Sequence, residues 1–440
     1  MRPIGEYKVS APTTNTRRKI ARRTALVLAF LLSLSAGYLL CGHVLQGYSK
    51  TSSWGGAAKL EGGPAPARGG TSRNSARKDG SSKDRARSAS SSTSTTSSAP
   101  ATQRIHTLTT TNGSPYQNYQ MRIAYASYKR MLAMPGGEHH VAFTRILHRT
   151  ARDKDVLARE VPTFRAEPLQ PECDDWCPYP VSDRANAVSQ YWAHAKRKGI
   201  LQDVDWVYMI ESDYIFVKPL LPPTIDLDRN KTYGFYFHYI QPPFHVEDME
   251  KLYDGPPGDV QSTGPAPLLM TVENWIKVTP IWEELTARIE ADEGMKNRLG
   301  WVREMYAFSS ALRIAGVTVI LDSPGAASTT PVHFIRELPI HNDLEGAHAL
   351  HYTLPTIINP ADGGDEGGVV WSYDKREHTA EEEVLRVENV DHLPEWPGEG
   401  RWKFIEGQPV TKPVYDLLVL MVSGFNAAID SLEDLPGTTD

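Results

Sequence analysis

Two carboxylates, Glu211 and Asp213, are separated by one residue and directly follow the apolar run WVYMI at residues 206–210. The run is short and rich in β-branched and aromatic residues, which predicts a buried strand. In open α/β sheets, ligands collect beyond the carboxyl ends of the strands, and hard oxygen donors there suit Mg²⁺ or Mn²⁺. An isolated acid-x-acid tripeptide is usually a solvated turn, because short motifs often match by chance. The position after a buried strand favours a cation-binding site in this case.

The elements that must position these acids alternate between strand and helix, which predicts one mixed α/β domain over residues 105–440. Strands are predicted at 105–110, 141–147, 206–210, 233–239, 268–270 and 317–321, and helices at 116–134, 182–197, 272–292 and 301–315. We expect Ser182 to cap its helix, Pro280 to kink or divide the third helix, and Gly316 to close the fourth. Beyond Asp322 few elements are expected, apart from an apolar helix at 414–429 that packs on the domain.

Strand, turn, helix and strand at residues 105–147 are typical of the opening of a Rossmann-like half. No Gly-x-Gly-x-x-Gly pattern accompanies them, so NAD or FAD is not expected.

The distribution of charge argues against a nucleic-acid partner. The first 104 residues carry 17 Lys and Arg against 4 Asp and Glu, which leaves 30 basic and 49 acidic residues for the remainder. An acidic body has no positive field to gather phosphates, so no nucleic-acid partner is expected.

The N-terminal region has the organisation of a membrane anchor and a spacer. Residues 24–45 contain no Asp, Glu, Lys or Arg and are long enough to cross a bilayer, while the basic residues before them keep a tail at 1–23 in the cytosol. We interpret the span as an uncleaved signal anchor of a type II protein, with a cleaved signal peptide as the alternative. Residues 46–104, rich in Ser, Thr and Arg, predict a disordered stalk.

Two further features fit a lumenal body. Cys41 lies in the predicted span, and Cys173 and Cys177 are the two cysteines outside it, so a local disulfide is favoured over a thiolate zinc site. Sequons begin at Asn112 and Asn230, and we expect only the second to be glycosylated, because Pro115 follows the first.

Several segments taken together resemble the plant and algal hydroxyproline O-arabinosyltransferases and, more distantly, the peptidyl-serine galactosyltransferases. The segments are HTLTTTNGSPYQNYQMRIAYASYK from His106, FTRILH from Phe143, MIESDYIFVKPL from Met209, GWVREMYAF from Gly300, HYT from His351 and WSYDKREH from Trp371. Each is weak alone, but the ordered set across residues 105–380 is specific. In the family, Glu-Pro-Asp usually stands where this chain has Glu211-Ser212-Asp213; both carboxylates are preserved, and the turn is less rigid.

The resemblance implies a type II glycosyltransferase of the Golgi membrane with a GT-A-type fold. It also implies the reaction, in which L-arabinofuranose moves from a UDP-sugar donor to the hydroxyl of hydroxyproline in a protein acceptor, with retention of the anomeric configuration. The departing diphosphate needs neutralisation, which Mn²⁺ or Mg²⁺ can supply. We assign Asp213 as a direct ligand, Glu211 as a partner of the metal's water shell or of the ribose, and His351 as a third ligand. The alternative for His351 is a histidine held by hydrogen bonds in the core.

Further candidates surround this set. Glu304, on a helix whose apolar stripe would bury it, could accept the acceptor's proton or stabilise an oxocarbenium-like centre; otherwise it is an exposed helix residue. Asp374 is a second catalytic candidate, and the neighbouring Lys375 and Arg376 could grip the diphosphate or form a solvated turn. The remaining donor-binding candidates are Thr109, Thr111 and Asn112 at the end of the first strand, and Arg122 and Arg145, which salt bridges explain equally well.

Other functions remain open on the sequence. Galactose transfer to peptidyl serine is the second enzymatic hypothesis. A non-catalytic lumenal binding protein that keeps the fold is the third, although such a protein could lose its acidic pair and this chain has both acids. A cell-surface structural protein would need repeats or a Pro-rich array, and neither is present.

Overall fold

The computed structural model describes residues 103–148, 155–169, 179–223, 231–323, 330–363 and 368–436. These ranges belong to one compact unit, Thr95–Asp440. The predicted tail, membrane anchor and nearly all of the predicted stalk lie outside the described residues, as do Cys41, Cys173, Cys177 and the sequon residue Asn230. Those expectations therefore remain predictions.

A seven-stranded mixed sheet forms the centre of this unit, which confirms the predicted fold class at the level of a mixed α/β domain. Its order is β3-β2-β1-β4-β7-β6-β8. The strands are β1 (Ile105–Thr111), β2 (His140–Leu147), β3 (Thr163–Arg165), β4 (Trp206–Ile210), β6 (Lys231–Phe235), β7 (Leu268–Thr271) and β8 (Thr318–Asp322). The first four in this order run parallel, whereas β7 is antiparallel to both of its neighbours. The predicted strand at 233–239 is shorter than expected, since β6 ends at Phe235.

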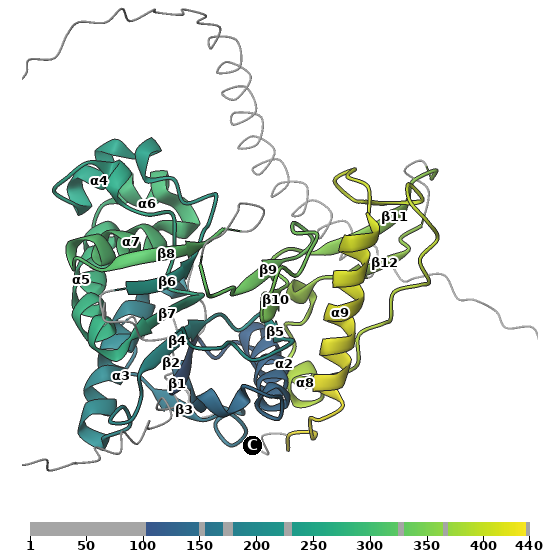
Figure 1. Cartoon of the computed structure of the whole chain (residues 1–440), viewed down its shortest axis with the longest axis horizontal. Coiled ribbons are helices and arrows are strands. Elements are labelled where there is room, and N and C mark those ends of the chain that lie inside the picture. Colours follow the sequence, from purple (N-terminus) through teal and green to yellow (C-terminus); the bar gives the residue numbers. More distant parts are fainter. Residues whose placement is uncertain are drawn as a thin grey trace, which may run out of the picture. The chain divides into compact units, whose positions relative to one another are not determined.

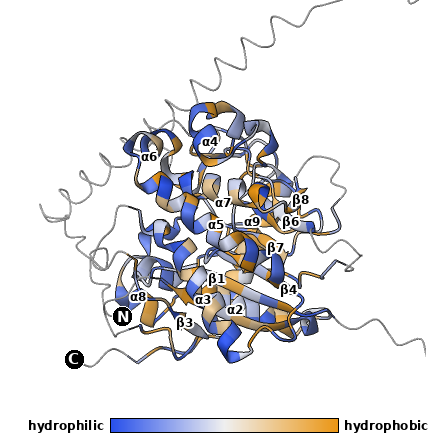
Figure 2. Cartoon of the chain, turned by 90° about the vertical axis from the view of Figure 1, so that its left-hand side faces the viewer, coloured by the Kyte–Doolittle hydropathy of each residue, from blue (hydrophilic) through white to orange (hydrophobic). Residues whose placement is uncertain are grey.

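Helices lie on both sides of the sheet (Figure 1). On one side α3 (Arg184–Lys198), α5 (Val272–Glu290) and α7 (Arg303–Ile314) contact one another in series, and the short helices α4 (Val246–Leu252) and α6 (Glu293–Leu299) lie beyond them. On the other side is α2 (Pro115–Leu132). Figure 2 views the first layer from outside, where α6 is mainly hydrophilic and the strand β7 is mainly hydrophobic.

Local sequence explains where most helices begin. Ser114 caps α2 by accepting a hydrogen bond from the Gln117 amide at 3.4 Å. The predicted cap of α3 is wrong, because the Ser182 hydroxyl donates to the Tyr179 carbonyl within a 3₁₀ turn and the helix begins at Arg184. Pro280 does not divide α5. The bond lost there would reach the carbonyl of Ile276, a residue 45% exposed, where water can replace it.

The region after Asp322 contains far more structure than expected. Two three-stranded sheets, β5-β10-β9 and β12-β11-β13, are built mainly from this region, and β5 joins them from before Asp322. Their strands are β5 (Tyr214–Phe216), β9 (Ile335–Glu337), β10 (Ala349–His351), β11 (Thr356–Pro360), β12 (Trp371–Tyr373) and β13 (Trp402–Phe404). Most are three residues long, and β5 pairs with β10 across more than 130 residues. Such short strands carry little local signal, because their stability comes from distant partners.

Two helices complete this region, α8 (Glu381–Leu385) and α9 (Lys412–Ile429). By length and composition α9 could cross a membrane, but more than half of it is buried within the protein. It packs against α2 and β5, and a Cβ on Gly424 would lie 2.7 Å from a methyl group of Ile215. The expectation that this helix packs on the domain is confirmed.

Candidate active site

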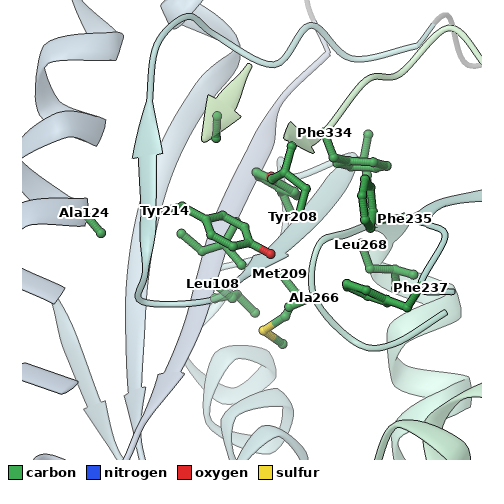
Figure 3. Close-up of a cluster of buried hydrophobic side chains, with 14 of the residues drawn as sticks. Leu108, Ala124, Tyr208, Met209, Tyr214, Phe235, Phe237, Ala266, Leu268 and Phe334 are labelled. Atoms are coloured by element: carbon green, nitrogen blue, oxygen red, sulfur yellow. The ribbon is translucent and has the colours of Figure 1, made fainter. Parts of the chain in front are cut away.

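The acid pair lies in the turn between two strands that belong to different sheets. β4 is the central strand of the large sheet. β5 begins directly after Asp213 and belongs to the three-stranded sheet β5-β10-β9. Figure 3 shows Tyr208 and Met209 of β4 and Tyr214 of β5 in one cluster of buried side chains. Because both strands are anchored in this core, the turn that carries Glu211 and Asp213 is held at both ends.

Pairing between β5 and β10 brings His351 to Asp213. His351 lies opposite Tyr214 in the antiparallel register, and its Nε2 is 3.1 Å from Oδ2 of Asp213. Lys375, which follows β12, donates from its ammonium group to the same oxygen. His351 and Lys375, predicted from separate segments, therefore meet at the buried carboxylate of Asp213.

The charges in this group shift one another's pKa. Burial alone would raise the pKa of Asp213, but His351 and Lys375 hold it well below its ordinary value. Burial would lower the pKa of His351, but Asp213 and Glu337 raise it to about 9. His351 is therefore an imidazolium at neutral pH, with Nδ1 2.9 Å from the Thr353 hydroxyl and 3.6 Å from Oε1 of Glu337.

Glu211 and Glu304 are connected through Arg184, the first residue of α3. Nη2 of Arg184 donates to Oε2 of Glu211 at 2.9 Å, and Nη1 lies 3.7 Å from Oε1 of Glu304. The prediction that Glu304 is buried by its helix is confirmed, since only 3% of it is exposed. Among the described residues, Oε1 of Glu304 has no hydrogen-bond partner. Burial raises the pKa of Glu304 to about 7; Arg184 opposes this shift and Glu211 adds to it.

The end of β1 lies beside this group. β1 is parallel to β4 with Thr109 opposite Ile210, so Thr111 and Asn112 extend along the same edge of the sheet as Glu211 and Asp213. The hydroxyls of Thr109 and Thr111 are buried and have no partner among the described residues. Asn112 is occupied locally: its Oδ1 accepts from the Ser114 amide at 2.9 Å.

Two predicted donor-binding residues are used elsewhere. The Arg122 guanidinium, 1% exposed, donates to Glu160 and to the carbonyls of Val384, Leu385 and Glu433. Arg145, fully buried, contacts Asn118, Asp155 and Thr163. None of these partners is a site residue, so the salt-bridge explanation accounts for both arginines and the donor-binding role does not.

Asp374 and Arg376 form a local pair next to the site. Nη2 of Arg376 donates to Oδ2 of Asp374 at 2.7 Å, and 47% of the Arg376 side chain is exposed. Lys375 stands between them in the chain and donates to Asp213, which places this pair next to the buried group. Asp374 is thus engaged by an arginine, whereas the Arg376 guanidinium still faces solvent.

Two site residues were not predicted. Arg184 follows a turn and could be recognised only by its two acidic partners, which come from other elements. Glu337 reaches the site because β9 lies parallel to β10, with Glu337 opposite His351. Neither residue carries a short-range motif, so the fold is what identifies them.

The carboxylate oxygens at this site are of the type that binds a divalent cation. No group of three or more His, Cys, Asp or Glu residues is arranged to hold a metal among the residues the structure describes. A cation such as Mg²⁺ typically takes one or two carboxylates and completes its shell with water and substrate phosphates, so a full protein cage is not required. Asp213 and Glu211 offer such oxygens. His351 could join them only after losing the proton between its Nε2 and Asp213.

Comparison with known proteins identifies relatives. A family model described as the hydroxyproline O-arabinosyltransferase family N-terminal domain matches residues 105–321. The chain is 32% identical over 285 residues to hydroxyproline O-arabinosyltransferase 3 of Arabidopsis thaliana, covering 64% of this chain and 73% of that protein. Identity is 30% over 279 residues to hydroxyproline O-arabinosyltransferase RDN1 of Medicago truncatula, covering 62% and 72%.

Two matches are more distant. Peptidyl serine alpha-galactosyltransferase of Arabidopsis thaliana is 23% identical over 317 residues, covering 68% of this chain and 35% of that protein. A solved glycosyltransferase involved in glycosylation of the major capsid of PBCV-1 superposes with a TM-score of 0.31 and 9% identity, covering 57% of this chain and 93% of that one. The family match includes Arg184, Glu211, Asp213 and Glu304, whereas His351 and Lys375 lie beyond it.

Proposed function

Because this chain belongs to the hydroxyproline O-arabinosyltransferase family and is a glycosyltransferase, we propose that it transfers L-arabinofuranose from UDP-arabinofuranose to the hydroxyl of hydroxyproline in a protein acceptor. The configuration at the sugar's anomeric carbon is retained. The observation that carries the proposal is the 32% identity to a named arabinosyltransferase. The meeting of Asp213, Lys375, Glu211 and Glu304 at one sheet edge supports it, since sugar transfer needs both a charge-neutralising group and a proton acceptor.

The proposed GT-A-type site binds the nucleotide at the end of β1 and the diphosphate next to Asp213. Thr109 and Thr111 supply unpartnered hydroxyls to the ribose or base. Lys375, and Arg376 with its exposed guanidinium, neutralise the departing diphosphate. A divalent cation, Mn²⁺ or Mg²⁺, would be held by Asp213 with help from Glu211 and His351, and would act as a Lewis acid on the phosphate oxygens.

Glu304 is the proposed proton acceptor. A buried carboxylate with a pKa of about 7 is charged in about half of the molecules at neutral pH and can take a proton from the acceptor hydroxyl. Oε1 lies 3.7 Å from Nη1 of Arg184 but has no hydrogen-bond partner among the described residues, so it can accept a hydrogen bond from that hydroxyl. Arg184 holds Glu304 near Glu211 and keeps its pKa from rising further.

The proposal for the compartment rests on the sequence alone. We propose that residues 24–45 anchor the enzyme in the Golgi membrane as a single-pass type II protein, with the catalytic body lumenal. Occupancy of the sequon at Asn230 in protein isolated from membranes is the expected result. An unglycosylated Asn230 together with a protease-accessible body in sealed vesicles would place the body in the cytosol.

The full-length enzyme, given UDP-arabinofuranose, Mn²⁺ and a hydroxyproline peptide, should add one pentose, detected by mass spectrometry. Asp213→Asn should abolish the addition. Asp248→Asn, at a buried carboxylate paired with Arg298 outside the site, is the matched control and should remain active. Full activity in Asp213→Asn would remove the assigned role of Asp213.

Galactose transfer to serine is the second candidate, because the match to the peptidyl serine galactosyltransferase spans 68% of this chain. A panel that crosses UDP-arabinofuranose and UDP-galactose with hydroxyproline and serine peptides separates the two activities. Transfer of galactose to serine without any pentose transfer would replace the first proposal with the second.

A further inference from the structure

Three large aromatic side chains are exposed on loops that flank the candidate active site. Exposure reaches 74% for Phe244, 66% for Trp301 and 38% for Tyr239. We call these residues the aromatic patch. Exposure of an aromatic side chain to water is unfavourable, and a binding partner that covers the ring removes this cost. Several exposed aromatic residues beside an active site therefore indicate a surface for a ligand.

Trp301 is held close to Glu304. Gly300 ends α6 with a φ of +62°, a conformation that favours glycine, and the chain then makes the 3₁₀ turn Gly300–Val302 before α7. The Trp301 ring packs edge-on against Tyr179, with ring centroids 5.3 Å apart. The Tyr179 hydroxyl accepts a hydrogen bond from the Glu304 amide at 3.2 Å. Through Tyr179, Trp301 is fixed beside the proposed proton acceptor.

Phe244 belongs to a loop that is tied to the same helix. This loop follows β6 and contains the 3₁₀ turn Pro242–Phe244. The Gln241 amide donates to the Tyr306 hydroxyl at 3.0 Å, and the His245 ring packs against the Tyr306 ring at 5.1 Å. Tyr306 is two residues beyond Glu304 on α7, so the loop and Trp301 flank the same first turns of α7.

Tyr239 lies on the same loop, where its ring packs against the Phe237 ring with centroids 5.2 Å apart. Burial raises the pKa of its hydroxyl, and Glu337, Glu211 and Asp213 raise it further. Since 38% of the residue is exposed, part of the ring faces solvent. The aromatic patch therefore combines Tyr239 and Phe244, on the loop after β6, with Trp301 in the 3₁₀ turn before α7.

We propose that the aromatic patch binds the acceptor as an extended proline-rich chain in the polyproline II conformation and thereby presents a hydroxyproline to Glu304. The inference rests on the proposed function, because that function makes hydroxyproline the acceptor. Proline-rich segments are already close to this conformation in water, so they lose little entropy on binding, and their rings dock on aromatic surfaces. Such a chain rises about 3.1 Å per residue, so it presents its proline rings at short, regular intervals.

Kinetics with two acceptors test the proposal. One peptide is a hydroxyproline decamer; the other is a flexible Gly/Ser peptide of equal length with one hydroxyproline. In Trp301→Ala and in Phe244→Ala we expect the KM for the decamer to rise about tenfold, the loss typical of one aromatic contact at an interface. The KM for the flexible peptide, and the hydrolysis of UDP-arabinofuranose without acceptor, should not change. Trp301→Phe should retain most of the affinity, and Ile276→Ala, an exposed apolar residue on α5, is the control.

Binding without reaction separates this inference from the proposed function. A decamer of unmodified proline lacks the hydroxyl, yet it should bind the wild-type enzyme in calorimetry and protect Trp301 from hydroxyl-radical oxidation, whereas a Gly/Ser decamer should do neither. This footprint uses wild-type protein, so it does not depend on how well the variants fold. Absence of both protection and binding would overturn the inference even if pentose transfer occurs. Protection without any pentose transfer would support the patch and overturn the proposed function.

Discussion

Asp213 and Glu304 are both buried acids beside a cation, yet their environments shift them in opposite directions. Asp213 contacts two cations, Lys375 and His351, through one oxygen, and its pKa is held well below the ordinary value. Among the described residues Glu304 pairs only with Arg184, at 3.7 Å and shared with Glu211, and burial raises its pKa to about 7. The difference lies in the number and distance of the cations, because burial penalises the charge on both acids.

This contrast separates two tasks that sugar transfer requires. An acid that stays charged at every physiological pH can hold cations and organise a diphosphate, but it cannot exchange a proton. An acid with a pKa near neutrality can exchange a proton at physiological pH. Two acids in different electrostatic environments therefore divide the chemistry between them, and each of the following experiments tests one side of the contrast.

The largest effect is expected from Asp213→Ala. The variant leaves Lys375 and His351 buried without their counter-charge, which should cost about 3 to 5 kcal/mol of stability, the range for breaking a buried ion pair. Activity should fall roughly 1,000-fold or more, as when an electrostatic group is removed from a transition state. Thermal unfolding and kcat/KM for pentose transfer measure the two losses.

The matched variant for this experiment is Asp248→Ala, which removes a buried carboxylate from Arg298 outside the site. It should lose stability and keep its activity per folded molecule. If the two variants lost activity equally, Asp213 would be no more than a structural residue and the contrast with Glu304 would not hold.

Glu304→Gln should reduce kcat/KM by about 100-fold to 10,000-fold, the usual contribution of general acid–base catalysis. The wild-type kcat/KM should rise with pH through about 7 as Glu304 loses its proton, and this limb should vanish in the variant. Glu290→Gln, which removes the carboxylate partner of Arg303, is the control and should keep the limb. An unchanged pH profile in Glu304→Gln would assign the proton transfer to another group.

Stability gives a second measurement of the same shift. A carboxyl whose pKa is raised in the folded protein contributes stability that is fully present below its ordinary value of 4.5 and is lost as the pH rises through about 7. The glutamine variant has no such loss. We therefore expect urea denaturation between pH 5 and pH 8 to show a smaller decline in stability for Glu304→Gln than for the wild type.

Arg184→Lys should have a smaller effect, about tenfold to 100-fold on kcat/KM. A single ammonium group cannot serve Glu211 and Glu304 as the two ends of a guanidinium do. Because Arg184 lowers the pKa of Glu304, the limb near pH 7 should move to higher pH in the variant. Arg298→Lys, at an arginine paired with Asp248, should leave the limb in place. If the rising limb of the kcat/KM profile stayed near pH 7 in Arg184→Lys, Arg184 would not set the pKa of Glu304.

Most strands of the large sheet could be predicted from sequence because they are apolar runs bounded by polar turns, whereas the three-residue, partly exposed β3 was not predicted. β1, β2, β4, β7 and β8 all lie within a residue or two of their predicted bounds. The small sheets could not be predicted. β5 is three residues long and follows the acid pair directly, and only its pairing with β10 makes it a strand.

The site residues likewise fall into those that could be predicted from sequence and those that could not. Glu211, Asp213 and Glu304 lie on or beside elements with strong local patterns, so their neighbourhood could be anticipated. Arg184 could not, because its role comes from two contacts across the fold. Arg122 shows the opposite case: of its two expected roles the contacts favour the structural one, and an arginine in a matching segment gives no sign that its donors are used by backbone carbonyls.

The smallest effect on activity is expected from Arg122→Met, which tests where the site ends. The variant leaves Glu160 and three carbonyls without their buried donor, so stability should fall by about 3 kcal/mol. The KM for UDP-arabinofuranose, measured per folded molecule, should stay within about twofold of the wild type. Arg376→Met is the matched comparison: its guanidinium is half exposed, so stability should hardly change, whereas the KM for the donor should rise several-fold because a phosphate contact is lost. The reverse result would return Arg122 to the donor site and leave Arg376 as surface charge.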